Sequence, residues 1–141
     1  MITRTASAVW EGNLVKGKGE VRLGSGAFEG AYSFTSRFED GMGTNPEELI
    51  GAAHAGCFSM ALSGILAEAG FTPTRVATKA AVKMDKINDG FKIVRIDLTT
   101  EAEVPGIDEA TFLTHAQAAK AGCPVSQALA SVETTLTAQL R

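Results

Sequence analysis

The sequence predicts an α+β protein with a largely antiparallel sheet, and three observations support this fold class. Apolar and polar residues alternate with period two in several short segments, which is typical of half-buried strands. Two longer segments instead carry helix capping and stop signals. The resulting order, βββ-α-ββ-α-α-β, groups strands that short turns can join, as antiparallel pairing requires. With 141 residues, the chain is expected to form one domain, residues 1–141.

Three strands are expected in the first third of the chain. Alternate positions from Ile2 to Trp10 share one face of the first strand, and the following EGN is a turn signal. Residues 14–23, LVKGKGEVRL, form a second strand that its glycines weaken. Residues 31–38, AYSFTSRF, are expected to form a third. One face of that strand would carry Tyr32, Phe34, Ser36 and Phe38.

A long helix is expected from Pro46 to about Ala69. Thr44 or Asn45 can cap its start, and proline suits the first helical position. The two glutamates that follow favour the positive N-terminal end. Gly70 is the expected stop.

The apolar side chains of this helix point in every direction, which predicts that the helix is buried all round. A chain of this length can hardly enclose such a helix, so we expect a homodimer in which a second copy packs its own helix alongside. Gly56, Ser59, Ser63 and Gly64 would permit close contact. A membrane span is the competing interpretation, but His54 interrupts the run and no flanking anchor residues are present.

The second half of the chain begins with a hairpin of residues 75–87 and 91–104 around the turn signal NDG. A second helix is expected over residues 105–122, with Asp108 as its cap. Residues 123–130 form a short third helix. Residues 131–141 alternate as a last strand.

The composition excludes several classes of function. The chain is 45% hydrophobic and 21% charged, with a net charge of −3, so it has no electrostatic footprint for nucleic acid. The N-terminal residues form no apolar signal region, and a cytoplasmic protein is expected. In that compartment, paired thiols usually serve redox or metal chemistry rather than structural disulfides.

Two cysteines, Cys57 and Cys123, are the candidate reactive groups. A buried cysteine is often only a small apolar residue. Cys123, however, precedes Pro124, which places its sulfur at a helix N-terminus where thiolate is favoured. Cys57 would lie about 16 Å from the start of its helix, beyond the reach of the helix dipole. It therefore needs a side-chain partner, or a helix break at a nearby glycine.

Zinc binding is an alternative use of the same side chains. His54, Cys57, His115 and Cys123 could supply a tetrahedral site, although HxxC on a helix is not a common zinc motif. His54 lies on the same helix face as Cys57 and could tune the thiol, or it could be a core histidine with a satisfied hydrogen bond. His115 is expected at the surface.

The segments RFEDGMGTNPEELIGAAHAGCFSMAL and AKAGCPVSQ closely resemble the family of OsmC and the organic hydroperoxide resistance proteins. The resemblance extends to VWEGNLVKGKGEV, EAGFTPT and VPGID, and so covers essentially the whole chain. It implies a fold of antiparallel sheets wrapped around long central helices in an intertwined homodimer. It also implies a thiol-dependent peroxidase of oxidative and osmotic stress defence that needs no bound cofactor and no metal.

The resemblance further implies the roles of four residues. Cys57 would be the peroxidatic cysteine and form a sulfenic acid. Cys123 would resolve it as a Cys57–Cys123 disulfide. An external dithiol, of lipoyl type for the family's relatives, would reduce that disulfide. Arg37 and Glu48 would complete the catalytic set, with Arg37 holding thiolate and peroxide and Glu48 orienting its guanidinium group.

Helix geometry tests this set, because Glu48 and Cys57 would lie about 180° and about 13.5 Å apart on a straight helix. Either the helix bends, or Arg37 bridges the two positions, in its own chain or across the dimer. A site at or near the subunit interface is therefore expected. Apolar residues near Cys57 favour organic hydroperoxides over hydrogen peroxide as substrates. A redox sensor that binds apolar molecules and a zinc-stabilised structural dimer are the competing functions.

Overall fold

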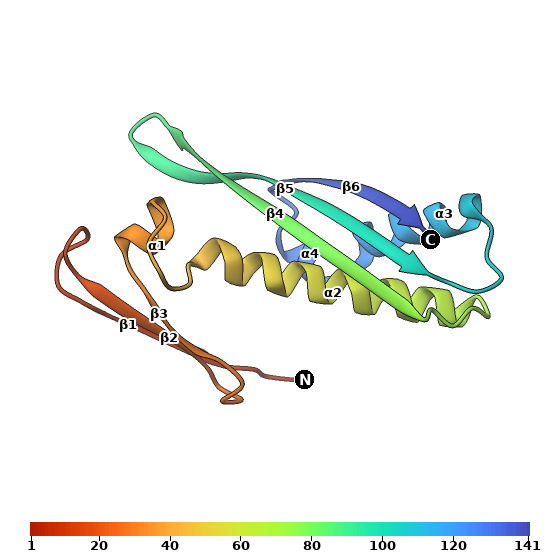
Figure 1. Cartoon of the computed structure of the whole chain (residues 1–141), viewed down its shortest axis with the longest axis horizontal. Helices are drawn as coiled ribbons and strands as arrows, with labels where there is room; N and C mark the ends of the chain where they lie inside the picture. Colours follow the sequence, from red (N-terminus) through yellow and green to blue (C-terminus); the bar gives the residue numbers. More distant parts are fainter. The chain divides into compact units, whose positions relative to one another are not determined.

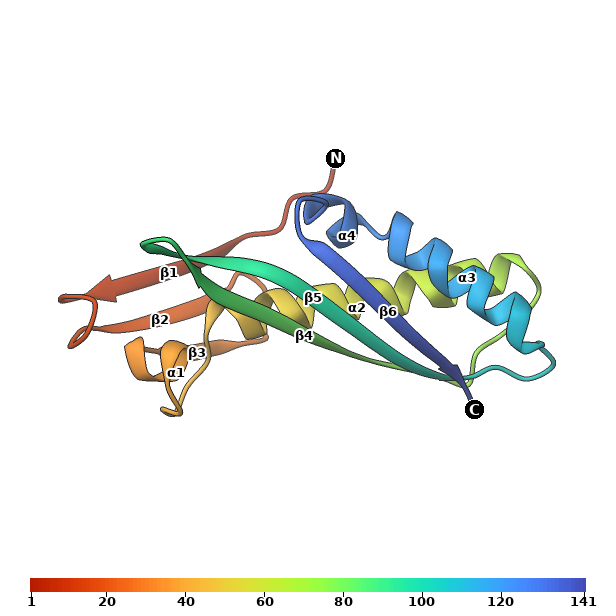
Figure 2. The same ribbon diagram turned by 90° about the horizontal axis from the view of Figure 1, so that it is seen from above.

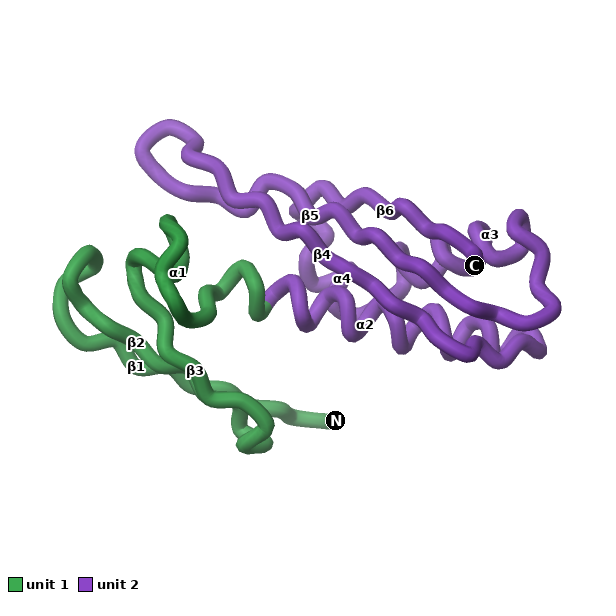
Figure 3. Tube along the Cα trace, in the orientation of Figure 1, with its two compact units in different colours: residues 1–49 green, residues 50–141 purple.

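The computed structural model describes residues 1–141 as two units, residues 1–49 and residues 50–141 (Figure 3). The boundary falls within the first turn of the long helix α2, Pro46–Glu68.

Residues 1–49 contain a three-stranded antiparallel sheet in the order β1-β2-β3. The strands are β1 (Ala6–Glu11), β2 (Lys18–Leu23) and β3 (Glu29–Tyr32). Their register brings Trp10 and Tyr32 to either side of Gly19, and the two rings pack 5.4 Å apart between centroids. A side chain at Gly19 would collide with both rings, so the glycine permits this close approach.

The third expected strand ends early, and Phe34–Phe38 instead form the short helix α1. Ser33 and Ser36 form a capping box: Ser36 N–H donates to Ser33 Oγ at 3.2 Å, and Ser33 N–H donates to Ser36 Oγ at 2.8 Å. Phe34 and Phe38 pack with ring centroids 4.9 Å apart. A spacing of four residues fits one face of a strand and one face of a helix equally well, which is why the alternation was misleading.

Helix α2 begins and ends where its capping residues predict. Asn45 Oδ1 accepts a hydrogen bond from Glu48 N–H at 2.8 Å, so Asn45 rather than Thr44 caps the helix. At the other end, Gly70 adopts φ of +92°, and Phe71 N–H donates to Leu66 C=O at 2.8 Å. This is the glycine-terminated helix end that the sequence predicts.

Residues 50–141 add a second sheet in the order β4-β5-β6. Strands β4 (Arg75–Ile87) and β5 (Gly90–Glu103) form the expected long hairpin, with Asn88 at φ of +56° in its turn (Figure 1). The pairing register of β4 with β5 shifts between Lys83 and Met84.

Strand β6 (Glu133–Leu140) pairs with β5 in parallel, which differs from the expected antiparallel pattern. Helices α3 (Glu109–Gly122) and α4 (Pro124–Ala128) connect β5 to β6 (Figure 2). This connection carries the chain back to the starting end of the sheet, so the last strand must run in the same direction as β5.

The main core joins α2 and α3 to one face of the β4-β5-β6 sheet (Figures 1 and 2). Its fully buried members come from three elements: Phe58, Leu62 and Leu66 of α2; Ile96, Leu98 and Ala102 of β5; and Phe112, Ala116 and Ala119 of α3. The β5 residues alternate along the strand, as a sheet with one buried face requires.

Helix α2 is buried on one face only within the chain. His54, Phe58, Leu62 and Leu66 form its buried stripe, whereas Ala53, Gly56, Met60, Gly64 and Ala67 are exposed. The expected burial all round is therefore not reached in a single chain. By length and composition α2 could cross a membrane, with 28% of its most apolar window buried in the chain, but a core helix of a soluble protein meets the same criteria.

Candidate active site

The two cysteines come together in residues 50–141. Cys57 lies on the fourth turn of α2 and is half-buried, whereas Cys123 lies between α3 and α4 and is buried. Both are free thiols, and they lie close enough for Cys123 to influence the pKa of Cys57. Two neighbouring thiols of one chain are the arrangement that an intramolecular disulfide requires.

Cys123 ends one helix and begins the next. Its N–H donates to Ala119 C=O at 3.0 Å as the C-cap of α3, and its Sγ accepts from Ser126 N–H at 3.3 Å as the N-cap of α4. Pro124 occupies the first position of α4. The predicted placement of this sulfur at a helix N-terminus is confirmed.

The pKa of the Cys57 thiol is raised above its ordinary value, chiefly because the group is partly removed from water. The backbone amide of Val125, in the first turn of α4, acts on the sulfur in the opposite sense and lowers the pKa in part. The neighbouring Cys123 thiol raises it again. The amides of α4 therefore face both sulfurs, which the sequence did not reveal for Cys57 because α4 lies far along the chain.

Behind Cys123 lies a pair of polar side chains. The Cys123 thiol donates to Ser126 Oγ at 3.1 Å, and Ser126 Oγ lies 2.7 Å from His54 Nε2. His54 is fully buried, its Nδ1 has no hydrogen-bond partner, and burial lowers its pKa. His54 was expected either to tune the Cys57 thiol or to be a core histidine with a satisfied hydrogen bond. The structure agrees with the second interpretation at Nε2, but Nδ1 has no partner.

Arg37 of α1 pairs with Glu47 of α2 in residues 1–49. Arg37 Nε donates to both carboxylate oxygens at 3.2 Å, and Nη2 donates to Oε1 at 2.7 Å. Glu47 is buried, and about a third of the Arg37 side chain is exposed. The guanidinium group lies 5.3 Å from the centre of the Phe38 ring. This fork-to-carboxylate geometry fixes the plane of the guanidinium group.

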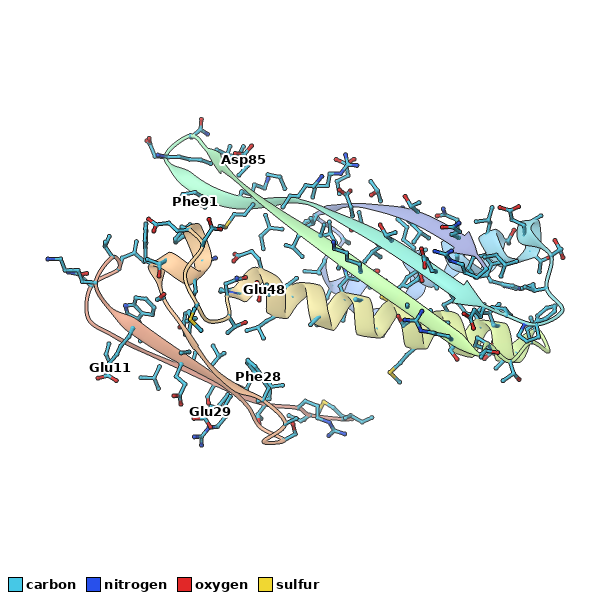
Figure 4. All side chains as sticks on the ribbon, viewed as in Figure 1. Glu11, Phe28, Glu29, Glu48, Asp85 and Phe91 are labelled. Carbon is cyan, nitrogen blue, oxygen red and sulfur yellow. The ribbon has the colours of Figure 1, made fainter.

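Polar contacts between α1 and the start of α2 hold this ion pair in place. Asn45 Nδ2 donates to Ser36 C=O at 3.1 Å, and Ser36 Oγ donates to Thr44 C=O at 2.7 Å. The side chain of Glu48, also in the first turn of α2, is exposed (Figure 4). The carboxylate that orients Arg37 in this structure is thus that of Glu47, which the sequence reasoning missed. The expected role of Glu48 stays a prediction.

A cleft of about 230 Å³ opens beside Arg37 in the same unit. It is lined by Trp10, Leu14, Tyr32, Ser33, Phe34, Arg37 and Phe38. Aromatic and aliphatic walls with one cation at the edge suit a small molecule that has an apolar body and a polar end.

The side chains considered for zinc do not form a site. No group of three or more His, Cys, Asp or Glu side chains in the chain converges closely enough to hold a metal ion. His54 and Cys123 meet through Ser126 instead of facing a common centre.

The profile of the family described as OsmC-like protein matches residues 39–137, which include Glu47 and both cysteines. The chain belongs to the OsmC-like family. The protein named peroxiredoxin OsmC of Escherichia coli (strain K12) is 55% identical over 141 residues, covering 99% of this chain and 98% of that protein. An organic hydroperoxide resistance protein of Xanthomonas axonopodis pv. citri is 35% identical over 99 residues, covering 69% of this chain and 68% of that protein.

Solved structures show the same OsmC-like fold. An OsmC-like protein from Mycoplasma pneumoniae matches with a TM-score of 0.77 at 14% identity, covering 99% of this chain and 97% of that one. An organic hydroperoxide resistance protein from Elizabethkingia anophelis matches with a TM-score of 0.74 at 24% identity, covering 99% of each chain. The family and the fold class predicted from sequence are confirmed.

Proposed function

We propose that this OsmC-like protein is a thiol-dependent peroxidase that reduces organic hydroperoxides, and hydrogen peroxide less well, in defence against oxidative and osmotic stress. The observation that carries the proposal is the proximity of the free thiols of Cys57 and Cys123. Relatives named peroxiredoxin and organic hydroperoxide resistance protein support the same reaction class. We place the protein in the cytoplasm, where such thiols stay reduced between turnovers.

The reaction needs no group beyond the two thiols, the peroxide and a reductant. The Cys57 thiolate attacks one peroxide oxygen, the O–O bond breaks, and the other oxygen leaves as alcohol or water. Cys57 is then a sulfenic acid. Cys123 displaces its hydroxyl group to form a disulfide and release water. An external dithiol of lipoyl type returns both cysteines to thiols, so we propose no metal, haem or flavin.

Arg37 supplies the charge that the surroundings of Cys57 lack. Glu47 engages Nε and Nη2 of the guanidinium group, so the N–H donors of Nη1 have no acceptor in the chain. In the proposed complex those donors face the thiolate and the peroxide oxygens and stabilise the leaving oxygen. Arg37 reaches Cys57 either within its own chain or from the partner of the homodimer. Glu48 remains a proposed site residue through the family resemblance.

The cleft beside Arg37 is the proposed site for the organic part of the substrate. Burying apolar surface against its aromatic walls contributes about 25 cal/mol per Å², and hydrogen peroxide has no such surface to bury. The preference for organic hydroperoxides follows from this difference.

The test uses cumene hydroperoxide with an excess of a small dithiol. Wild-type protein should turn over many times, and Cys57→Ser should not react. Cys123→Ser should consume one equivalent and then stop with Cys57 oxidised. Mass spectrometry of wild-type protein after one equivalent should show a disulfide within one chain. A single oxidation without turnover would identify a redox sensor instead of a peroxidase.

A further inference from the structure

Four side chains of residues 50–141, those of Cys57, Cys123, Ser126 and His54, form a continuous polar network that the peroxidase cycle does not fully use. Cys57 lies beside Cys123, Cys123 donates to Ser126 Oγ at 3.1 Å, and Ser126 Oγ lies 2.7 Å from His54 Nε2. The members come from α2, the α3–α4 junction and α4. The network begins at the Cys57 sulfur and ends at the buried imidazole of His54.

The donors and acceptors of this network are compatible with a single direction of donation, from Cys123 to Ser126 to His54. Ser126 Oγ accepts from the Cys123 thiol, so its own proton is available for the nearest acceptor, His54 Nε2. This arrangement assigns the imidazole proton to Nδ1, which is the buried atom without a partner. With this tautomer, Cys123 and Ser126 both donate toward the imidazole.

The imidazole is neutral and available as a base at physiological pH. Burial alone lowers the pKa of His54, and no charged side chain contributes to the shift. Among titratable groups, only the thiol of Cys123 is joined to His54 through Ser126, and Cys57 lies three residues along the same helix. A neutral Nε2 with a free lone pair can accept a proton.

We propose that Ser126 and His54 form a proton relay that positions the resolving cysteine and removes its proton as the disulfide closes. This inference rests on the proposed peroxidase cycle. The Cys123 sulfur supplies the electron pair for the new S–S bond, and the S–O bond of oxidised Cys57 breaks. The departing hydroxide takes a proton from solvent and leaves as water. The Cys123 proton passes to Ser126 while Ser126 passes its own proton to His54 Nε2.

The relay meets a real chemical need. A thiol with an ordinary pKa of about 8.5 is only a few per cent thiolate at pH 7, and the thiolate is the attacking form. As the S–S bond forms, the Cys123 sulfur loses its basicity, so transfer of its proton to a weak base becomes favourable. His54 then releases this proton to solvent, and the Cys123 sulfur takes up a proton again when the external dithiol cleaves the disulfide.

The experiment separates the two steps by rapid mixing with one equivalent of cumene hydroperoxide. Sulfenic acid is trapped on Cys57, and disulfide is followed by acid quench and mass spectrometry between pH 6.5 and 8. In wild-type protein the rate of disulfide formation should be nearly independent of pH in this range. In Ser126→Ala it should be at least tenfold slower at pH 7 and should rise about tenfold per pH unit, because free thiolate must form first.

Three further variants make the test specific. Ser126→Thr keeps the hydroxyl and should restore the flat profile. His54→Gln can still accept the Ser126 hydrogen bond but cannot take a proton, so it should show the steep profile. Ser59→Ala is the matched control, because it also removes a serine hydroxyl. Ser59 lies on α2 and donates to Thr78 Oγ1 at 2.8 Å, so it takes no part in the network of Cys57, Cys123, Ser126 and His54. It should keep the wild-type profile.

The outcomes distinguish the relay from the cycle on which it rests. Flat profiles in both Ser126→Ala and His54→Gln, at wild-type rates, would overturn the relay. A wild-type protein that forms no sulfenic acid on Cys57 would overturn the peroxidase proposal itself. If Ser126→Ala does not fold, the His54→Gln and Ser126→Thr pair gives the same decision.

Discussion

The Cys57 sulfur lies in surroundings that act on its proton in opposite directions. Partial burial and the neighbouring Cys123 thiol raise its pKa, and the Val125 amide only partly offsets them. A thiol of raised pKa is a poor source of thiolate at pH 7, so a cation is required for fast attack on a peroxide. In the proposed site Arg37 meets this need, and its orientation depends on the carboxylate that holds it.

Adjacent glutamates provide a matched test of that orientation. Glu47→Gln should lower kcat/KM for cumene hydroperoxide about tenfold to a hundredfold, because hydrogen bonds to charged groups contribute about 1.5–3 kcal/mol each. Glu48→Gln removes the same charge from the next residue, whose side chain is exposed, and should have the smaller effect. A larger loss in Glu48→Gln than in Glu47→Gln would restore the assignment that the family resemblance gave.

This pair also shows where sequence reasoning ends. The sequence identified both cysteines and Arg37 by motif, because each residue is the only one of its type in its segment. It could not separate two neighbouring glutamates, which differ by about 100° around a helix. The choice depends on where α1 lies, and α1 was expected to be a strand.

The buried imidazole of His54 should make stability depend on pH. Its pKa is lowered in the folded protein, so below about pH 6.5 the unfolded chain binds more protons than the native one. The free energy of unfolding should therefore fall as the pH drops below about 6.5. Between pH 7.5 and pH 5.5, at fixed protein concentration, the urea midpoint of unfolding should decrease more for wild type than for His54→Gln. Parallel changes in both proteins would exclude this contribution.

At the scale of elements, the junction between α1 and α2 determines the geometry of the ion pair. Asn45 satisfies the first turn of α2 through Glu48 N–H and holds α1 through Ser36 C=O. The sequence narrowed the cap to Thr44 or Asn45, because a capping residue before proline and two glutamates is a strong local signal. The second contact was not predictable, because it joins two elements through a backbone carbonyl.

Replacing Asn45 tests both contacts together. Asn45→Ala should lower the free energy of unfolding by about 1–2 kcal/mol, through loss of the cap and of the hydrogen bond to Ser36. Asn45→Asp retains the cap acceptor but not the amide donor, so it should lose less stability while still disturbing the Arg37 pair. Denaturant titration gives the stability, and kcat/KM reports the pair. Equal stability losses in the two variants would mean that the cap contributes nothing.

At the scale of the whole molecule, helix α2 explains why the sequence suggested an assembly larger than one chain. Its apolar residues surround the helix, yet one chain buries only the stripe that runs from Glu47 to Leu66. The parallel placement of β6 was not predicted, because alternation marks a strand without giving its direction. The unpartnered face of α2, in contrast, was predictable. Apolar residues lie all around this helix, and a single layer in a small domain can bury only one side of it.

The exposed face of α2 is therefore the proposed centre of the homodimer interface, and Met60 is its largest side chain, with 79% of its surface exposed in the chain. Met60→Glu would place a charge in that interface, where burial without a partner is costly. We expect sedimentation velocity at micromolar concentration to show dimeric wild type and largely monomeric Met60→Glu. Met60→Leu, which keeps an apolar side chain of similar volume, should remain dimeric. A Met60→Glu protein that sediments as wild type would place the interface elsewhere, and α2 would then need another explanation for its apolar outer face.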